Sequence, residues 1–292
     1  MYTFPEFHRV VYITSSLPKE QATLSHYQTD PSNPKQSVWF IVFGQKILLT
    51  SNGDLPSALP GAISDDKLEP MVLGELQGRS CHMVVLEQDT AFAQAEMVDL
   101  RSLAERLPAE QFAMAGKACQ WETFLNNHRF CGRCGARMRQ VQWELAMHCD
   151  HCKHRCYPRL SPCIIVAVRR DRQILLAQNK RHKSGVYSVV AGFIEPGETV
   201  EQAVHRELAE EVGIAVTGLT YRASQPWPFP HALMMAFTAD YLAGDLVLEQ
   251  KEISDAGWYA ITEREVWPPL PDDYTVARQL IEQLIADIEQ ND

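Results

Sequence analysis

The chain has 292 residues, of which 46% are hydrophobic, and a formal net charge of −10 at pH 7. This length accommodates two domains with a small module between them, whereas the negative charge argues against a general binder of duplex DNA. No stretch approaches the ~18 apolar residues of a membrane span, and residues 1–16 lack the basic and apolar regions of a secretion signal. We therefore expect a soluble cytoplasmic protein.

Residues 1–126 are predicted to form a first domain that is a divergent relative of the last domain. The segment 37–50, SVWFIVFGQKILLT, indicates a strand, a turn at Gly44 and a second strand, and 163–178, CIIVAVRRDRQILLAQ, repeats this shape. The first copy lacks a glutamate-rich helix after its strands. We therefore expect it to have a structural or substrate-shaping role, not a catalytic one.

A helix is predicted over 109–127, directly after Pro108. Apolar side chains recur there at helical steps: Phe112, Ala115, Cys119 and, outside the strict period, Leu125. This helix leads into the next module and marks the domain boundary.

Residues 127–160 contain four cysteines with the spacing of a zinc site. Two C-x2-C pairs are separated by 14 residues, in CGRCGARMRQVQWELAMHCDHC. Such spacing predicts a tetrahedral Zn²⁺ held by four thiolates: Cys131, Cys134, Cys149 and Cys152. A closed four-thiolate site has no open position for water, so a structural role is favoured over catalysis.

Other zinc ligands are the weaker alternative. Four residues crowd the second cysteine pair and could replace one thiolate: His148, His151, His154 and Cys156. Three further cysteines are interpreted as ordinary thiols: Cys81, Cys119 and Cys163. Cysteines spaced for metal and not for disulfides indicate a reducing compartment.

The same module is locally basic. Residues 128–159 hold seven Lys/Arg against two Asp/Glu, in a chain that is acidic overall. Two interpretations are about equally supported: a solvated loop surface, or a surface that attracts a polyanionic substrate such as a nucleotide or RNA.

Residues 161–292 are predicted to form an α+β sandwich. Strands are expected at CIIVAV, QILLAQ, VYSVVAGF and LMMAFTADY, around a helix at 200–212. The closing segment 275–290 is an amphipathic helix with five residues directed inward: Val276, Leu280, Ile281, Leu284 and Ile288.

The helix at 200–212 carries an unusual charge pattern. Thr199 and Gln202 form a capping box ahead of it, and Gly213 suits a left-handed stop. Three carboxylates, Glu207, Glu210 and Glu211, fall within an arc of roughly 100° beside the apolar face, where like charges repel. Partly desolvated carboxylates bind protons or cations, and oxygen-only ligands suit Mg²⁺ or Mn²⁺. The alternative is a solvated acidic face.

This helix and the loop before it resemble the Nudix box. Gly192, Glu198 and the run Arg206-Glu207-Leu208-x-Glu210-Glu211-x-Gly213-Ile214 match that pattern without a gap or substitution. A pattern with so many fixed positions is very specific. The resemblance to Nudix hydrolases implies divalent cations that bridge a nucleoside diphosphate and activate water for attack at phosphorus.

The segment 224–235, SQPWPFPHALMM, has proline at every second position between Pro226 and Pro230. Proline excludes helix and stiffens an extended chain, in which Gln225, Trp227, Phe229 and His231 would share one face. Such a row of aromatic rings can stack flat heteroaromatic rings, and Gln225 can bond an amide edge. Two alternatives remain: a proline-rich ligand for an aromatic groove, or plain loop packing.

Together with the box, this segment resembles the SQPWPFPxS signature of NADH pyrophosphatases of the NudC type, which also remove NAD caps from RNA. That family has the same order of parts: a divergent N-terminal Nudix-like domain, a zinc ribbon and a catalytic Nudix domain, and it is dimeric. The resemblance covers most of residues 130–288 and is weak before Ala109. One departure is Ala232, where the signature has serine, and this puts substrate affinity or preference in question.

The resemblance implies the site residues. The Mg²⁺ or Mn²⁺ ligands are Glu207, Glu210, Glu211, Glu252 and the backbone of Ala191. Glu211 would activate the water, and Arg206 would orient the carboxylates. Phe193 would stack on the nicotinamide. The remaining substrate contacts are Glu144, Tyr157, Ala277 and the loop Gln225, Pro226, Trp227, Pro228, Phe229, Pro230, His231 and Ala232.

We therefore expect hydrolysis of the pyrophosphate of NAD(H) to nicotinamide mononucleotide and AMP, and removal of NAD caps from RNA, by a homodimer. One alternative is a Nudix hydrolase for ADP-ribose or another dinucleotide. The other is a zinc-ribbon protein without catalysis that binds RNA or senses a nucleotide.

Overall fold

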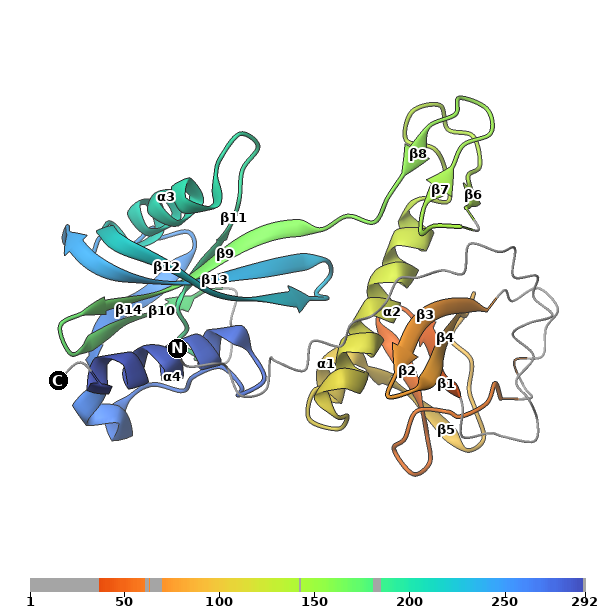
Figure 1. The fold of residues 1–292 in the computed structure, drawn as a ribbon, viewed down its shortest axis with the longest axis horizontal. Coiled ribbons are helices and arrows are strands. Elements are labelled where there is room, and N and C mark those ends of the chain that lie inside the picture. Colours follow the sequence, from red (N-terminus) through yellow and green to blue (C-terminus); the bar gives the residue numbers. More distant parts are fainter. Residues whose placement is uncertain (1–36, 61–62, 64–69, 142, 181–184, 291–292) are drawn as a thin grey trace. The chain divides into compact units, whose positions relative to one another are not determined.

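The computed structural model describes residues 37–60, 63, 70–141, 143–180 and 185–290 (Figure 1). The chain divides into two compact units after Arg159. Residues 1–36, which include the start of the predicted first domain and the residues 1–16 considered for a secretion signal, lie outside the described residues. The further division of the first unit at residue 126 stays a prediction.

The second unit is built on a six-stranded sheet. Its strands are β9 (Ser161–Arg170), β10 (Gln173–Asn179), β11 (Val190–Phe193), β12 (Ala215–Trp227), β13 (Ala232–Ala243) and β14 (Ile253–Ala260). Their order is β12-β13-β9-β10-β14, with β11 paired to β9. The β13–β9 pair is parallel and the other pairs are antiparallel. The predicted strands in this region are confirmed, although β11 is shorter than the segment 186–193.

Two helices cover opposite faces of this sheet (Figure 1). Helix α3 (Val200–Val212) packs Val204, Leu208 and Val212 into one apolar core, and α4 (Val276–Gln290) packs its buried residues into the other. A short 3₁₀ helix, η4 (Ile261–Val266), precedes α4. The predicted α+β sandwich is confirmed.

The capping signals of α3 are also confirmed. The Thr199 side chain accepts a hydrogen bond from the Gln202 backbone N–H, and the Gln202 side chain accepts one from the Thr199 backbone N–H. Gly213 ends the helix with φ of 79°, a left-handed conformation that favours glycine. The start and end of the acidic helix therefore follow from local sequence.

The first unit contains a second copy of the same sheet topology. Its strands are β1 (Ser37–Phe43), β2 (Lys46–Thr50), β3 (Met71–Leu76), β4 (Arg79–Val85) and β5 (Ala95–Asp99), in the order β3-β4-β1-β2-β5. Strand β1 pairs parallel with β4 and antiparallel with β2, as β9 does with β13 and β10. Among the described residues between β2 and β3, no α-helix takes the place of α3.

Helix α2 (Ala109–Asn127) follows β5 and the short helix α1 (Leu100–Leu103), as α4 follows β14. Its bounds match the prediction, but its inward face was only partly predicted. Ala115 and Cys119 are buried, whereas Phe112 and Leu125 are half-buried. The face also buries Met114, Ala118, Phe124 and the acidic Glu122. Glu122 accepts a hydrogen bond from the Gly44 backbone N–H at 2.7 Å, which fixes the β1–β2 turn against the helix.

The proline-rich segment is extended only in part. Gln225 and Trp227 lie in β12 and share a face, but residues 228–231 form the turn into β13, and Trp227 is paired with Ala232. The prediction that Phe229 and His231 continue the same extended face is therefore wrong. Proline cannot donate to a strand ladder, so alternating prolines are equally compatible with a hairpin turn.

Among the described residues, no helix is both long enough and apolar enough to cross a membrane.

Candidate active site and zinc ribbon

Gly192 and Glu207 fit together so closely that any other residue at position 192 would displace the Glu207 carboxylate. A Cβ atom added to Gly192 would lie 1.9 Å from the Glu207 carboxyl carbon and 2.1 and 2.3 Å from its two oxygens. Strand β11 therefore passes directly against the carboxylate of α3. The first glycine of the box pattern therefore makes room for the Glu207 carboxylate.

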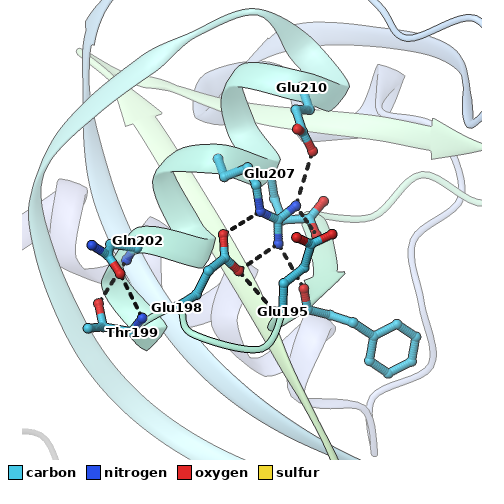
Figure 2. A network of polar contacts seen from close by, with 8 residues as sticks. Glu195, Glu198, Thr199, Gln202, Glu207 and Glu210 are labelled. Carbon is cyan, nitrogen blue, oxygen red and sulfur yellow. Dashed lines mark hydrogen bonds and ion pairs between the residues drawn. The ribbon is translucent and has the colours of Figure 1, made fainter.

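Arg206 connects the loop before α3 to the helix itself (Figure 2). Its guanidinium donates to Glu198 at 2.5 and 3.0 Å, to Glu207 at 2.9 Å and to Glu210 at 3.0 Å. It also donates to the Phe193 carbonyl at 2.9 Å, while Glu198 accepts from the Glu195 backbone N–H. These bonds hold the loop carboxylate and two helix carboxylates around one cation.

The charge balance at this network is negative. Glu198, Glu207 and Glu210 share the single positive charge of Arg206. Glu207 and Glu211 are only 9% and 5% exposed, and Glu210 is exposed. Burial raises the pKa of Glu207, whereas the bonds from Arg206 lower it. Burial, with a smaller contribution from the charges of Glu207 and Glu211, raises the pKa of the Cys163 thiol to about 12.

The donor set fits a divalent cation. The Arg206 guanidinium pairs with three carboxylates, so this group keeps a net charge of −2. Glu211, a fourth carboxylate, lies one helical turn after Glu207. Oxygen-only donors of this kind suit Mg²⁺ or Mn²⁺. Within the described part of the chain, only the four ribbon cysteines already converge to metal-ligand spacing. The glutamates are instead arranged around Arg206.

Two further predicted metal ligands lie near this network. Ala191 is in β11 beside Gly192 and is half-buried. Glu252 lies just before β14, and its charge acts on the Glu207 carboxyl, raising its pKa. Strands β11 and β14 both contact α3. The predicted ligands of the divalent metal therefore come from three segments of the second unit: β11, α3 and the turn before β14.

The predicted substrate loop lies at the end of β12. Trp227 and Phe229 contact each other edge to face, with ring centroids 5.0 Å apart. Gln225 does not present a free amide, because its Nε2 donates to the Tyr274 carbonyl and its Oε1 accepts from the Val276 backbone N–H. Pro228 and Ala232 are buried, and Pro226 and Pro230 are exposed. His231 Nδ1 lies 3.1 Å from the Ser161 hydroxyl.

Other predicted substrate contacts differ in exposure. The Phe193 ring is 55% exposed at the end of β11, where a flat ring could stack on it. Ala277 is buried in the first turn of α4. Tyr157 and Glu144 belong to the first unit, where Tyr157 is exposed and Glu144 is paired with Arg155 at 2.8 Å.

The sequence analysis assigned no site role to Glu198 or Tyr274. Glu198 makes two of the bonds to Arg206, and its place in the box pattern was the available signal. Tyr274 lies beside Trp227, with ring centroids 6.4 Å apart. No local pattern marks Tyr274, because its position depends on the pairing of distant segments.

The ribbon brings its four predicted zinc ligands together. Its short strands β6 (Arg139–Gln140), β7 (Met147–His148) and β8 (Arg155–Cys156) form one sheet. The Sγ atoms of Cys131, Cys134, Cys149 and Cys152 all lie within 4.8 Å of one another. Tetrahedral Zn²⁺ with bonds of ~2.3 Å needs sulfur atoms about 3.8 Å apart. Two of the pairs, Cys131–Cys152 and Cys134–Cys149, lie at 3.6 and 3.5 Å. A hydrogen bond from the Cys152 backbone N–H lowers the pKa of Cys149, which favours the thiolate.

The alternative zinc ligands are outside this group, and the three remaining cysteines are buried thiols. Among the described residues, the compact metal-ligand group contains neither Cys156 nor any histidine. Burial raises the pKa of Cys81 to about 12 and that of Cys119 further. These thiols therefore stay protonated and pack as small apolar side chains.

One face of the ribbon sheet carries cations. The register places Arg139, His148 and Arg155 opposite one another across β6, β7 and β8. Arg139 pairs with Asp150 and Arg155 with Glu144, and the Arg155 guanidinium lies 5.7 Å from the centre of the exposed Trp143 ring. Arg133 and Arg137 are exposed, and neither takes part in the ion pairs found among the described residues.

Family models match three consecutive parts of the chain. The NADH pyrophosphatase-like rudimentary NUDIX domain matches residues 36–121, the NADH pyrophosphatase zinc ribbon domain matches 126–157, and the NUDIX domain matches 158–284.

Curated relatives match most of the chain. The NAD-capped RNA hydrolase NudC of Klebsiella pneumoniae (strain 342) is 46% identical over 250 residues, covering 85% of this chain and 93% of the relative. NudC of Pectobacterium atrosepticum is 43% identical, covering 85% and 92%. A solved MutT NUDIX hydrolase from Burkholderia pseudomallei is 27% identical, covering 43% of this chain and 98% of its own, with a TM-score of 0.37.

Gly192→Ala is expected to weaken Mn²⁺ binding by about 10- to 100-fold, because the new Cβ would displace the Glu207 carboxylate. Calorimetric titration of the zinc-loaded protein measures this. Gly132→Ala is the matched control, since a Cβ there meets nothing within 4 Å. Unchanged Mn²⁺ affinity in Gly192→Ala would show that the Gly192–Glu207 contact does not shape a metal site.

Cys149→Ser is expected to abolish retention of zinc, whereas Cys156→Ser keeps about one zinc per chain, because only Cys149 belongs to the four-sulfur group. Metal content after gel filtration, measured by mass spectrometry, distinguishes the two. If Cys149→Ser kept its zinc and Cys156→Ser lost it, Cys156 and not Cys149 would be the fourth zinc ligand.

Proposed function

The chain belongs to the NudC family of Nudix hydrolases, and on this basis we propose that it hydrolyses the pyrophosphate bond of NAD(H) to nicotinamide mononucleotide and AMP. We extend the proposal to removal of NAD caps from RNA. The observation that carries it is the carboxylate network around Arg206, in a chain with all three parts of the family.

The catalytic metal in this proposal is Mg²⁺ or Mn²⁺, held by Glu207, Glu210, Glu211, Glu252 and the Ala191 carbonyl. The bound ion would neutralise phosphate oxygens and lower the pKa of water. The excess of carboxylates over cations supports this set. Zinc would remain in the ribbon as a structural ion, because four thiolates leave no open position.

The residues have separate tasks. Glu211, buried on α3, would accept the proton of the attacking water. Arg206 would act as a positioning residue, since its donors already bond Glu198, Glu207, Glu210 and the Phe193 carbonyl. The Phe193 ring would stack on the nicotinamide.

The substrate contacts carried over from the family are the loop 225–232, Ala277, Glu144 and Tyr157. Trp227 and Phe229 are the loop residues with accessible aromatic surface. Gln225 would contribute indirectly, because its amide holds the backbone of Tyr274 and Val276. Ala232 is buried. A serine hydroxyl at this position would therefore need a hydrogen-bond partner within the protein, because an unpaired buried hydroxyl is destabilising.

We propose a cytoplasmic homodimer. The thiols support a reducing compartment: four are grouped for zinc, and Cys81, Cys119 and Cys163 are free and buried. The dimer rests on the family resemblance alone, and light scattering after gel filtration tests it.

A Nudix hydrolase for ADP-ribose or another dinucleotide is the alternative enzyme. A nucleotide-binding protein without catalysis is disfavoured, because no carboxylate of the box is substituted.

Glu211→Gln is expected to lower NADH turnover by about 10² to 10⁴-fold, because the amide cannot accept a proton. Rates on NADH, ADP-ribose and diadenosine polyphosphates, with products identified by mass, test both the residue and the substrate. Glu201→Gln, an exposed change in the first turn of the same helix, is the control and should match the parent. Turnover near the parent rate in Glu211→Gln would eliminate this residue as the base, and preference for ADP-ribose would favour the alternative enzyme.

NAD-capped RNA with an unpaired 5′ end is expected to be cleaved with a steeper loss of efficiency on adding salt than NADH, because counterion release drives contacts to a phosphate chain. Arg133→Glu and Arg137→Glu should lower efficiency further on RNA alone. Salt titrations of kcat/KM on both substrates measure this, with Arg101→Glu on α1 as the control. Parallel slopes for the two substrates, unaffected by the ribbon changes, would leave free dinucleotides as the better-supported substrate.

A further inference from the structure

Exposed aromatic rings are concentrated in the zinc ribbon. In the described part of the chain, five aromatic residues are more than half exposed, and three of them lie within residues 128–159: Phe130, Trp143 and Tyr157. The other two, Phe193 and Tyr221, belong to the second unit. Large apolar side chains that gather on the surface of one small module mark a surface for a partner. Tyr157 already has a proposed role, whereas Phe130 and Trp143 have none.

Trp143 has an arginine over its ring. The Arg155 guanidinium lies 5.7 Å from the centre of the Trp143 ring and donates to Glu144 at 2.8 Å. The ion pair with Glu144 holds the guanidinium in place, and the cation in turn restricts the ring. Because Trp143 is 63% exposed, its ring keeps a large accessible surface besides the part that Arg155 covers.

Phe130 also lies beside an arginine. It pairs with Arg137 in an antiparallel bridge, and residues opposite each other in such a pair have Cβ atoms about 5 Å apart on the same face. Phe130 is 65% exposed. Arg137 is exposed too, and it takes part in none of the ion pairs found among the described residues. The ribbon therefore presents two pairs of a ring and an arginine.

The charge of the ribbon is opposite to that of the whole chain. Residues 128–159 hold seven Lys/Arg against two Asp/Glu, whereas the chain has a net charge of −10. Both acidic residues are paired within the ribbon, Glu144 with Arg155 and Asp150 with Arg139. A cationic surface that carries aromatic rings is the combination by which proteins bind single-stranded nucleic acids.

A nucleotide matches both members of such a pair. Its base stacks on the aromatic ring, and its phosphate accepts hydrogen bonds from the guanidinium. An apolar protein surface would instead bury the guanidinium without a partner, which is unfavourable. In a duplex the faces of the bases are covered by their neighbours, so the strand must be unpaired.

We propose that Phe130 and Trp143 stack on bases of single-stranded RNA, and that the arginines beside them contact its phosphates. This inference rests on the proposed function for the choice of RNA. It goes beyond that function, because it adds a surface for the nucleotides that follow the cap. Neither ring is among the substrate contacts carried over from the family.

The test measures binding of uncapped RNA to the zinc-loaded protein. The probe is a fluorescently labelled single strand of about 12 nucleotides with a 5′-hydroxyl end, followed by anisotropy. It carries no cap, so binding is measured independently of hydrolysis. The variants are Trp143→Ala, Phe130→Ala and Trp143→Tyr, which keeps a ring. Tyr221→Ala is the matched control, because Tyr221 is an exposed aromatic residue of the second unit.

Trp143→Ala and Phe130→Ala are each expected to weaken RNA binding by at least about fivefold, because each loses one stacked base. Trp143→Tyr and Tyr221→Ala should stay within about twofold of the parent. All four variants should keep their zinc, since these side chains are exposed. Their NADH turnover should match that of the parent.

The salt dependence of binding separates stacking from charge. Stacking releases no counterions, so the slope of log affinity against log salt in Trp143→Ala should equal that of the parent. Arg137→Glu should have a shallower slope, because it removes a phosphate contact.

Parent-like RNA affinity in both alanine variants would overturn the inference, as would an equal loss in Trp143→Tyr. A loss accompanied by a smaller particle mass in light scattering would also overturn it, because the rings would then join two copies of the chain. A protein that binds RNA through these rings but does not cleave NADH would uphold the inference and contradict the proposed function. NADH cleavage with unchanged RNA affinity in the alanine variants would do the reverse.

Discussion

The second unit depends on one ionic contact set, the Arg206 guanidinium with the carboxylates of Glu198, Glu207 and Glu210. It joins the loop after β11 to α3 and holds the buried Glu207 and the exposed Glu210 on one helix face, where their like charges would otherwise repel. Its geometry depends on the glycine at position 192, since a Cβ there would overlap the Glu207 carboxylate and displace it. The apolar side of α3, buried against the sheet, provides the fixed base on which this charged edge is held. A compact acidic site with one compensating arginine is then suited to a divalent cation.

The two units share one arrangement of strands. Strands β3-β4-β1-β2-β5 reproduce the order and pairing of β12-β13-β9-β10-β14, and each sheet is followed by a helix, α2 or α4, that packs against it. In the first unit the buried Glu122 lies on α2 and accepts hydrogen bonds from the backbone N–H groups of Gly44 and Gln45 and from the Asn126 side chain. In the second unit the acidic network lies on the loop after β11 and on α3, which the sheet supports.

Much of this architecture could be predicted because its signals are local. The capping box and Gly213 fix the bounds of α3, and the cysteine spacing fixes the four-sulfur group. Features that depend on contacts between distant segments of the chain could not be predicted. The substrate role of Gln225 stays a prediction, but no signal in the sequence indicates that its amide bonds the backbone of Tyr274 and Val276, about fifty residues away. The aromatic row ends at Trp227 because the chain turns there to pair with β13, and no pattern within 224–235 distinguishes a turn from an extended run.

The central claim is that the carboxylates around Arg206 support metal-dependent cleavage of a pyrophosphate bond. Incubating the zinc-loaded protein with NADH in ¹⁸O-labelled water, with and without added Mg²⁺ or Mn²⁺, tests it most directly when products are resolved by mass. The account predicts nicotinamide mononucleotide and AMP, with one labelled oxygen on a single phosphate, formed only when the divalent metal is added. Release of nicotinamide with an intact ADP-ribose product, or full turnover without added metal, would contradict it.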